Sequence, residues 1–81
     1  MSLEKLRTAR TVAGIHQVCR AVESNAAEMV FIASDVDERV LSTLLAACRE
    51  KGIVPDRTAT KAELGDRARL DVSAAAVATL R

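Results

Sequence analysis

The spacing of apolar residues changes from a helical period to a continuous run between residues 15 and 33, and this change constrains the fold most. Ile15, Val18, Cys19 and Val22 recur at i, i+3, i+4 and i+7, which is the stripe of an amphipathic helix. The run 29–33 is continuous and rich in β-branched residues, as expected of a strand covered on both faces. A helix followed by a doubly covered strand indicates an α/β domain.

Paired polar residues predict where two further helices begin. Asp35 and Glu38 have the spacing of a capping box and are expected to open a helix that ends at Gly52. Thr60 and Glu63 have the same spacing and predict a helix of two or three turns. The longer helix is expected to bury one apolar stripe, which consists of Val40, Leu41, Leu44, Leu45 and Cys48.

The remaining segments are expected to be short. Residues 3–10 fit an amphipathic helix, and residues 12–14 are expected to form a turn before the helix over about 14–24. Residues 53–54 resume an extended conformation, but Pro55 cannot donate a ladder hydrogen bond, so this strand is short or at an edge. The alternating residues from Leu70 onward predict a loop that leads into a strand.

Together these elements predict a single domain over residues 1–81, built as a three-layer α/β/α sandwich with a small mixed sheet. The strand at 29–33 is expected to be central. A chain this short buries one modest core, and Phe31 is its only aromatic residue, so aliphatic side chains must supply the packing.

We expect a cytoplasmic protein, because the sequence shows neither a membrane-spanning nor an export segment. No stretch approaches the roughly 20 consecutive apolar residues that span a bilayer, and the N-terminus lacks an apolar export segment. Cys19 and Cys48 lie within apolar stripes and are expected to be reduced core thiols. A monomer is favoured, although the sequence leaves the oligomeric state open.

Charge is distributed unevenly along the chain. Basic residues outnumber acidic ones in residues 1–27 and 57–81, whereas residues 28–56 are acidic and the net charge is only +1. If the two ends meet in the fold, one face could attract phosphate. An ordinary solvated surface explains the same distribution.

The helix that begins near Gly14 has a polar face opposite its apolar stripe. His16, Gln17 and Arg20 are related by spacings that bring their side chains together beside the helix N-terminus. Free N–H groups at such an end suit phosphate or base-edge acceptors, and arginine can bind guanine through two hydrogen bonds. The same pattern also occurs on the exposed face of any amphipathic helix.

The sequence resembles the ribosomal protein superfamily that binds kink-turn RNA, of the L-seven-Ae and L-thirty-e type, and particularly its short bacterial members. The family signature is Gly, any residue, Asn or Lys, Glu or Gln, two more residues, then Lys or Arg, and here it is Gly14-Ile15-His16-Gln17-Val18-Cys19-Arg20. Further matches are Ala33-Ser34-Asp35, Glu63-Leu64-Gly65 and residues 70–77. The resemblance implies recognition of tandem sheared G·A pairs at a sharp RNA bend, where the groove is wider than in A-form RNA.

The resemblance also implies which residues contact the RNA. These are Gly14, Ile15, His16, Gln17 and Arg20 on the helix and Leu70, Asp71 and Val72 in a loop. Gly14 would let the backbone approach closely, the polar side chains would face guanine edges and phosphates, and the loop would pack against a bulged nucleotide. His16 departs from the family's Asn or Lys. Because histidine is mostly neutral at pH 7, we expect affinity to rise as the pH falls from about 7.5 to about 6.

Other chemistries have weaker support in the sequence. Asp35, Asp37 and Glu38 could hold Mg²⁺, but helix capping explains two of them and no phosphate-binding glycine loop is present. His16 lies on the opposite helix face from Cys19, which argues against a zinc site with Cys48. We therefore predict a non-enzymatic RNA-binding module without metal or cofactor, whose partner is ribosomal RNA or a structured mRNA leader. The alternative is a protein-interaction module of the same fold with weak or lost RNA binding.

Overall fold

The structure, a computed structural model, describes residues 10–68 and 74–81 of the 81-residue chain. Its elements are β1 (Thr11–Ala13), α2 (Ile15–Glu23), β2 (Ala27–Ile32), α3 (Glu38–Lys51), α4 (Lys61–Arg67) and β3 (Ala76–Leu80). The helix expected over residues 3–10 lies almost wholly outside the described residues.

The named strands form an antiparallel sheet in the order β1-β3-β2, so β3 is the central strand. Our assignment of residues 29–33 as central was wrong, because the C-terminal strand inserts between β1 and β2. On the other side of β2, the Ile32 N–H donates to the Asp56 carbonyl at 2.8 Å and the Asp56 N–H donates to the Val30 carbonyl at 2.9 Å. In the described chain, parallel pairing is limited to this bridge, and residues 53–54 form no strand.

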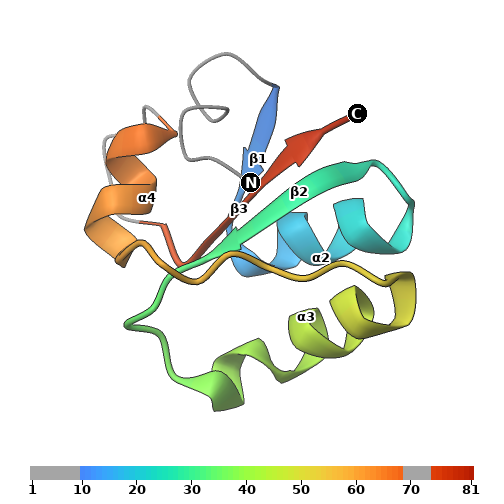
Figure 1. Ribbon diagram of the computed structural model, residues 1–81, viewed down its shortest axis with the longest axis horizontal. Coiled ribbons are helices and arrows are strands. Elements are labelled where there is room, and N and C mark those ends of the chain that lie inside the picture. The colour runs from blue at the N-terminus through green and yellow to red at the C-terminus, as the bar shows by residue number, and fades with distance from the viewer. Residues whose placement is uncertain (1–9, 69–73) are drawn as a thin grey trace.

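Helices cover both faces of the sheet (Figure 1), with α2 and α3 on one side and α4 on the other. Along β2, Val30 and Ile32 join the core formed with α2 and α3. The alternate residues Phe31 and Ala33 join a second core that includes Leu64 of α4. This alternation confirms the three-layer α/β/α architecture and the expectation that the strand is covered on both faces.

β1 is a strand where a turn was expected at residues 12–14. It pairs with β3 over three positions, from Thr11 opposite Thr79 to Ala13 opposite Val77. A strand this short has no periodicity of its own, so its conformation depends on the partner strand.

The start of α3 also differs from the expected one. The N-cap is Asp37, whose carboxylate accepts the Arg39 N–H at 2.9 Å, so the prediction of a capping box at Asp35 and Glu38 was wrong. Val40, expected in the core, is 58% exposed. It lies at the edge of a wide apolar stripe whose middle, including Leu41, is buried.

Three local predictions, at Gly52, at Thr60 with Glu63, and at the two cysteines, are confirmed. Gly52 ends α3 in the left-handed conformation, with a φ of 71°. Thr60 and Glu63 form a reciprocal capping box at the start of α4. Cys19 and Cys48 are buried free thiols. None of the helices in the described chain is long and apolar enough to cross a membrane.

Candidate nucleic-acid interface

Gly14 holds the start of α2 in a conformation that few other residues adopt. Its φ is 95° and its ψ is 146°, and it caps the helix without any side-chain hydrogen bond. Its N–H donates to the Ala76 carbonyl at 2.9 Å, and its carbonyl accepts the Val18 N–H at 3.0 Å. A Cβ on Gly14 would meet no atom within 4 Å, so the surface over this residue is open.

The first turn of α2 leaves backbone donors unsatisfied. The N–H groups of residues 15–17 have no hydrogen-bond partner among the described residues. Such groups at a helix N-terminus, with the positive end of the helix dipole, favour an anion or another hydrogen-bond acceptor. α2 has no acidic side chain in its first turn that would supply one internally.

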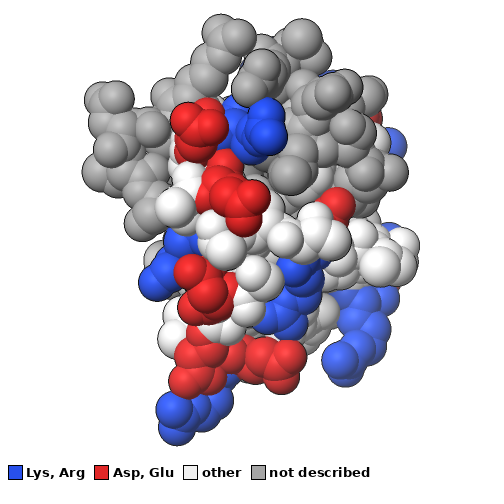
Figure 2. Space-filling view, turned by 60° about the vertical axis from the view of Figure 1, so that its left-hand side comes forward, with Lys and Arg blue, Asp and Glu red and all other residues white. Residues whose placement is uncertain are grey.

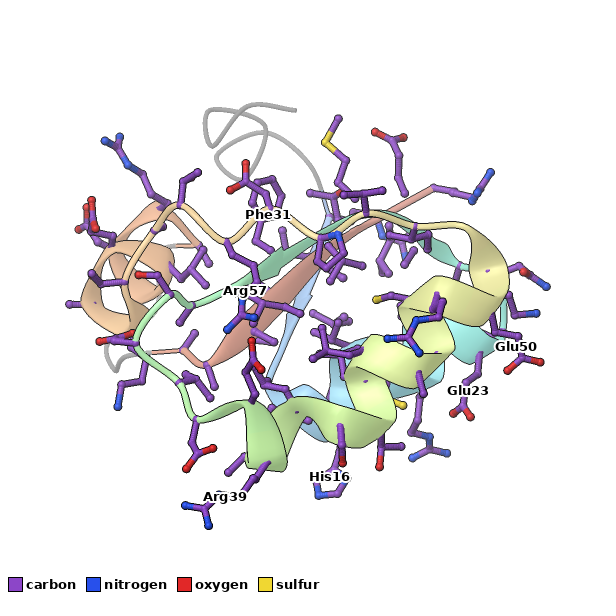
Figure 3. The ribbon with its side chains drawn as sticks, turned by 60° about the horizontal axis from the view of Figure 1, so that its bottom comes forward. His16, Glu23, Phe31, Arg39, Glu50 and Arg57 are labelled. Atoms are coloured by element: carbon purple, nitrogen blue, oxygen red, sulfur yellow. The ribbon has the colours of Figure 1, made fainter. Side chains whose placement is uncertain are left out.

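The three polar side chains predicted to bind RNA share the exposed side of α2. His16, Gln17 and Arg20 are exposed, and in Figure 3 His16 points away from the fold at its lower edge. His16 and Gln17 lie in the first turn of α2, and Arg20 lies one turn further along, four residues after His16 and three after Gln17. Ile15 is half-buried and packs against the core under α2 and α3.

Residues 74–76, where the chain enters β3, join the segments around the helix start. The Ala74 N–H donates to the Lys61 carbonyl at 3.1 Å, and the Ala33 N–H donates to the Ala75 carbonyl at 2.8 Å. The next carbonyl, that of Ala76, accepts from Gly14. The beginning of α2, the end of β2 and the beginning of α4 therefore meet at three consecutive residues. Leu70, Asp71 and Val72 lie outside the described residues. The described chain resumes at Ala74, which is part of this junction.

A groove lies beside the helix start. It has a volume of about 380 Å³ and is lined by Ile15, His16, Cys19, Val40, Thr43 and Ala75. The contributions of Val40, Thr43 and Ala75 to this groove are not predicted from the sequence. The apolar character of Val40 suggested burial in the core, and no local pattern shows that α3 leaves it facing α2.

Two acidic residues at the start of α3 form ion pairs within the protein. Asp37 pairs with Arg39 at 2.9 Å, and Glu38 pairs with Arg57 at 3.1 Å. Hydrogen bonds from the Arg39 side chain, and secondly from its backbone N–H, lower the pKa of Asp37. In the described part of the chain, no group of three or more His, Cys, Asp or Glu residues is arranged to hold a metal ion.

The first and last strands of the described chain lie side by side, because β1 pairs with β3. Figure 2 shows acidic and basic side chains interleaved on the side that includes α4 and the start of α3. The described residues on this side therefore form no broad positive patch.

These features define a class of small three-layer α/β domains in which an uncapped helix start is exposed beside a groove. The chain belongs to the Ribosomal protein L7Ae/L30e/S12e/Gadd45 family, whose family model matches residues 2–81. The resemblance found in the sequence is thereby confirmed.

Individual relatives match over the whole length. The chain is 33% identical over 82 aligned positions to a protein named as an RNA-binding protein from Geobacillus sp. (strain WCH70), with 100% of both chains covered. It is 34% identical to RNA-binding protein YbxF from Geobacillus stearothermophilus, again with 100% of both covered.

Solved structures share the fold. A protein of unknown function from Bacillus halodurans matches with a TM-score of 0.85 at 20% identity, covering 98% of this chain and 83% of that one. The Giardia lamblia 15.5kD RNA binding protein matches with a TM-score of 0.83 at 24% identity, covering 98% and 70%.

Proposed function

We propose that this protein is a non-enzymatic RNA-binding module that recognises kink-turn RNA through the start of α2. The observation that carries the proposal is the open helix N-terminus at Gly14, with free N–H groups beside exposed His16, Gln17 and Arg20. Family membership and the names of the Geobacillus relatives support RNA as the ligand.

Each part of this surface has a role in the proposed mechanism. The backbone at Gly14 allows close approach, because no side chain stands between it and the RNA. The N–H groups of residues 15–17 bind phosphate or base-edge acceptors. Arg20 donates to a guanine edge through two hydrogen bonds, and Gln17 and His16 each donate to or accept from a neighbouring base.

The width of the RNA groove explains why a kink-turn suits this site better than a regular duplex. The deep groove of A-form RNA is too narrow for side chains, whereas a sharp bend opens it to a helix end. Recognition by stacking has little support, because Phe31 is the only aromatic residue and is 1% exposed. Leu70, Asp71 and Val72 are proposed to pack against the bulged nucleotide at the bend.

The partner is proposed to be ribosomal RNA or a structured mRNA leader in the cytoplasm, bound by a monomer. Titration of the protein with a short kink-turn duplex tests the proposal. The control duplex has its two G·A pairs replaced by Watson–Crick pairs. We expect selective binding of the kink-turn that weakens as salt rises, because phosphate contacts release counterions. Failure to bind either duplex below the micromolar range would refute RNA recognition and favour the protein-interaction alternative.

Two arginines allow a matched test of the binding surface. Arg20 and Arg49 are both exposed and both lie in the last turn of their helices, so their effects on the helix dipole are similar. Arg49 lines a different groove, at the C-terminal end of α3. Arg20→Ala should lose about 1–3 kcal/mol of binding free energy, and Arg49→Ala should lose little. Equal losses would contradict the assigned surface.

A further inference from the structure

Asp35 makes a long-range hydrogen bond that joins the turn after β2 to α4. It follows β2, and its carboxylate Oδ1 accepts the N–H of Lys61, the first residue of α4, at 2.9 Å. The preceding residue, Ser34, donates its N–H to the Ala59 carbonyl at 2.8 Å. Two adjacent hydrogen bonds thus hold the turn after β2 against the beginning of α4.

The contact continues toward residues 74–76, which also bond to the start of α2. The Lys61 carbonyl accepts the Ala74 N–H at 3.1 Å, and two residues later the Ala76 carbonyl accepts the Gly14 N–H at 2.9 Å. Asp35 is therefore connected to Gly14 through Lys61 and residues 74–76.

Local structure does not explain why an aspartate occupies position 35. The start of α3 uses Asp37 as its cap and does not involve Asp35. An exposed carboxylate near a phosphate-binding surface disfavours RNA through charge repulsion. The hydrogen bond from Lys61 to Asp35 offsets this repulsion, because it stabilises the start of α4. α4 has only seven residues, and a helix this short depends on hydrogen bonds at its ends.

We propose that Asp35 is a positioning residue for RNA binding, because its carboxylate fixes the start of α4, and through it residues 74–76, which bond to the start of α2. This inference rests on the proposed function. Asp35 itself touches no RNA in this arrangement. When this hydrogen bond is lost, a smaller fraction of the molecules holds α4 in the position that allows RNA binding. The apparent affinity for RNA falls in proportion to that fraction.

Three variants test this role. Asp35→Ala removes the acceptor and should weaken kink-turn binding by roughly fivefold to tenfold. Asp35→Asn keeps an Oδ1 acceptor without the charge, so its affinity should stay within about twofold of the natural protein. Asp37→Ala is the matched control. It removes an aspartate from the same turn, but the carboxylate of Asp37 accepts from α3 and not from α4. Its affinity should change little.

Amide hydrogen exchange measured without RNA provides a second readout. In Asp35→Ala the amides of Lys61 and Ala74 should exchange faster, while the Arg39 amide is unchanged. In Asp37→Ala the pattern should reverse, because the Arg39 amide loses its acceptor. All binding is measured well below the melting temperature of each variant, so that every sample is folded.

The outcomes separate this inference from the proposed function. If the natural protein does not distinguish the kink-turn from its control, both fail. If it does and Asp35→Ala binds equally well, only the positioning role is overturned. Tighter binding by Asp35→Ala and Asp35→Asn alike would show that Asp35 acts by direct charge repulsion, which also overturns it. An equal loss in the two variants would assign the effect to the charge and contradict the hydrogen-bond mechanism.

Discussion

Replacement of Gly14 by alanine tests the backbone geometry on which the candidate site depends. The φ of 95° and ψ of 146° at this position fall in a region that is nearly exclusive to glycine. An added Cβ meets no atom within 4 Å, so the substitution introduces backbone strain without a steric clash. The backbone cannot relax freely, because the Gly14 N–H and carbonyl are hydrogen-bonded to Ala76 and Val18.

The expected loss of stability follows from two opposing terms. Strain in such a region is about 1–3 kcal/mol, and the lower freedom of alanine in the unfolded chain offsets about 0.4–1 kcal/mol. Because Gly14 lies outside the left-handed helical region, we place its strain near the upper limit and expect a net loss of about 2 kcal/mol. A domain of this size loses roughly 4–8 °C in Tm for each kcal/mol.

Gly52→Ala is the matched control. Gly52 also has a positive φ, of 71°, and a Cβ there also meets no atom within 4 Å. Its ψ of 25° places it in the left-handed helical region. Alanine there is strained by about 1–2 kcal/mol. After the same offset from the unfolded chain, the net loss should be about 1 kcal/mol or less.

Urea denaturation and RNA titration of the two variants form the assay. Gly14→Ala should have the lower midpoint at an unchanged m value. It should also bind the kink-turn less tightly, because its methyl group lies on the surface proposed to face RNA, whereas Gly52→Ala should bind normally. Equal losses of stability would refute the backbone reasoning, and unchanged RNA affinity in Gly14→Ala would refute the assigned surface.

Four further predictions concern other parts of the molecule. His16→Lys should strengthen kink-turn binding at pH 7.5, measured at constant salt, because lysine is fully charged at this pH. Thr60→Ala should lower the free energy of unfolding by about 1 kcal/mol, seen in urea, because it removes half of a capping box. Leu64→Ala should lower it by about 2–5 kcal/mol, because Leu64 is 1% exposed in the core beneath α4. Burial raises the pKa of the Cys19 and Cys48 thiols, so both should react slowly with an aromatic disulfide reagent at about pH 8 until the protein unfolds. Because these folded pKa values are raised, any stability linked to the thiols is complete below the unfolded pKa and is lost as pH rises through the folded value.

Local sequence patterns were sufficient to predict α2 and the start of α4, which lie at the candidate site. The stripe from Ile15 to Val22 predicted α2, and the structure gives Ile15–Glu23. The pair Thr60 and Glu63 predicted the start of α4. These signals work from sequence because the groups that interact are within one or two helical turns of each other. The polar face of α2 was predicted for the same reason, and its role in RNA binding stays a prediction.

Partners far apart in the chain decided what local patterns could not. β1 is a strand because Thr11–Ala13 pairs with residues near the C-terminus. Asp35 accepts from Lys61 of α4, and does not cap α3, because the fold brings Lys61 beside it. The spacing of Asp35 and Glu38 favoured a local cap, but a carboxylate accepts from whichever free N–H lies closest in space. By itself, the sequence determined α2, the start of α4 and the end of α3. Only the tertiary structure decided the strand order and the meeting of three segments at residues 74–76, because hydrogen bonds between distant residues depend on the packing of the whole chain.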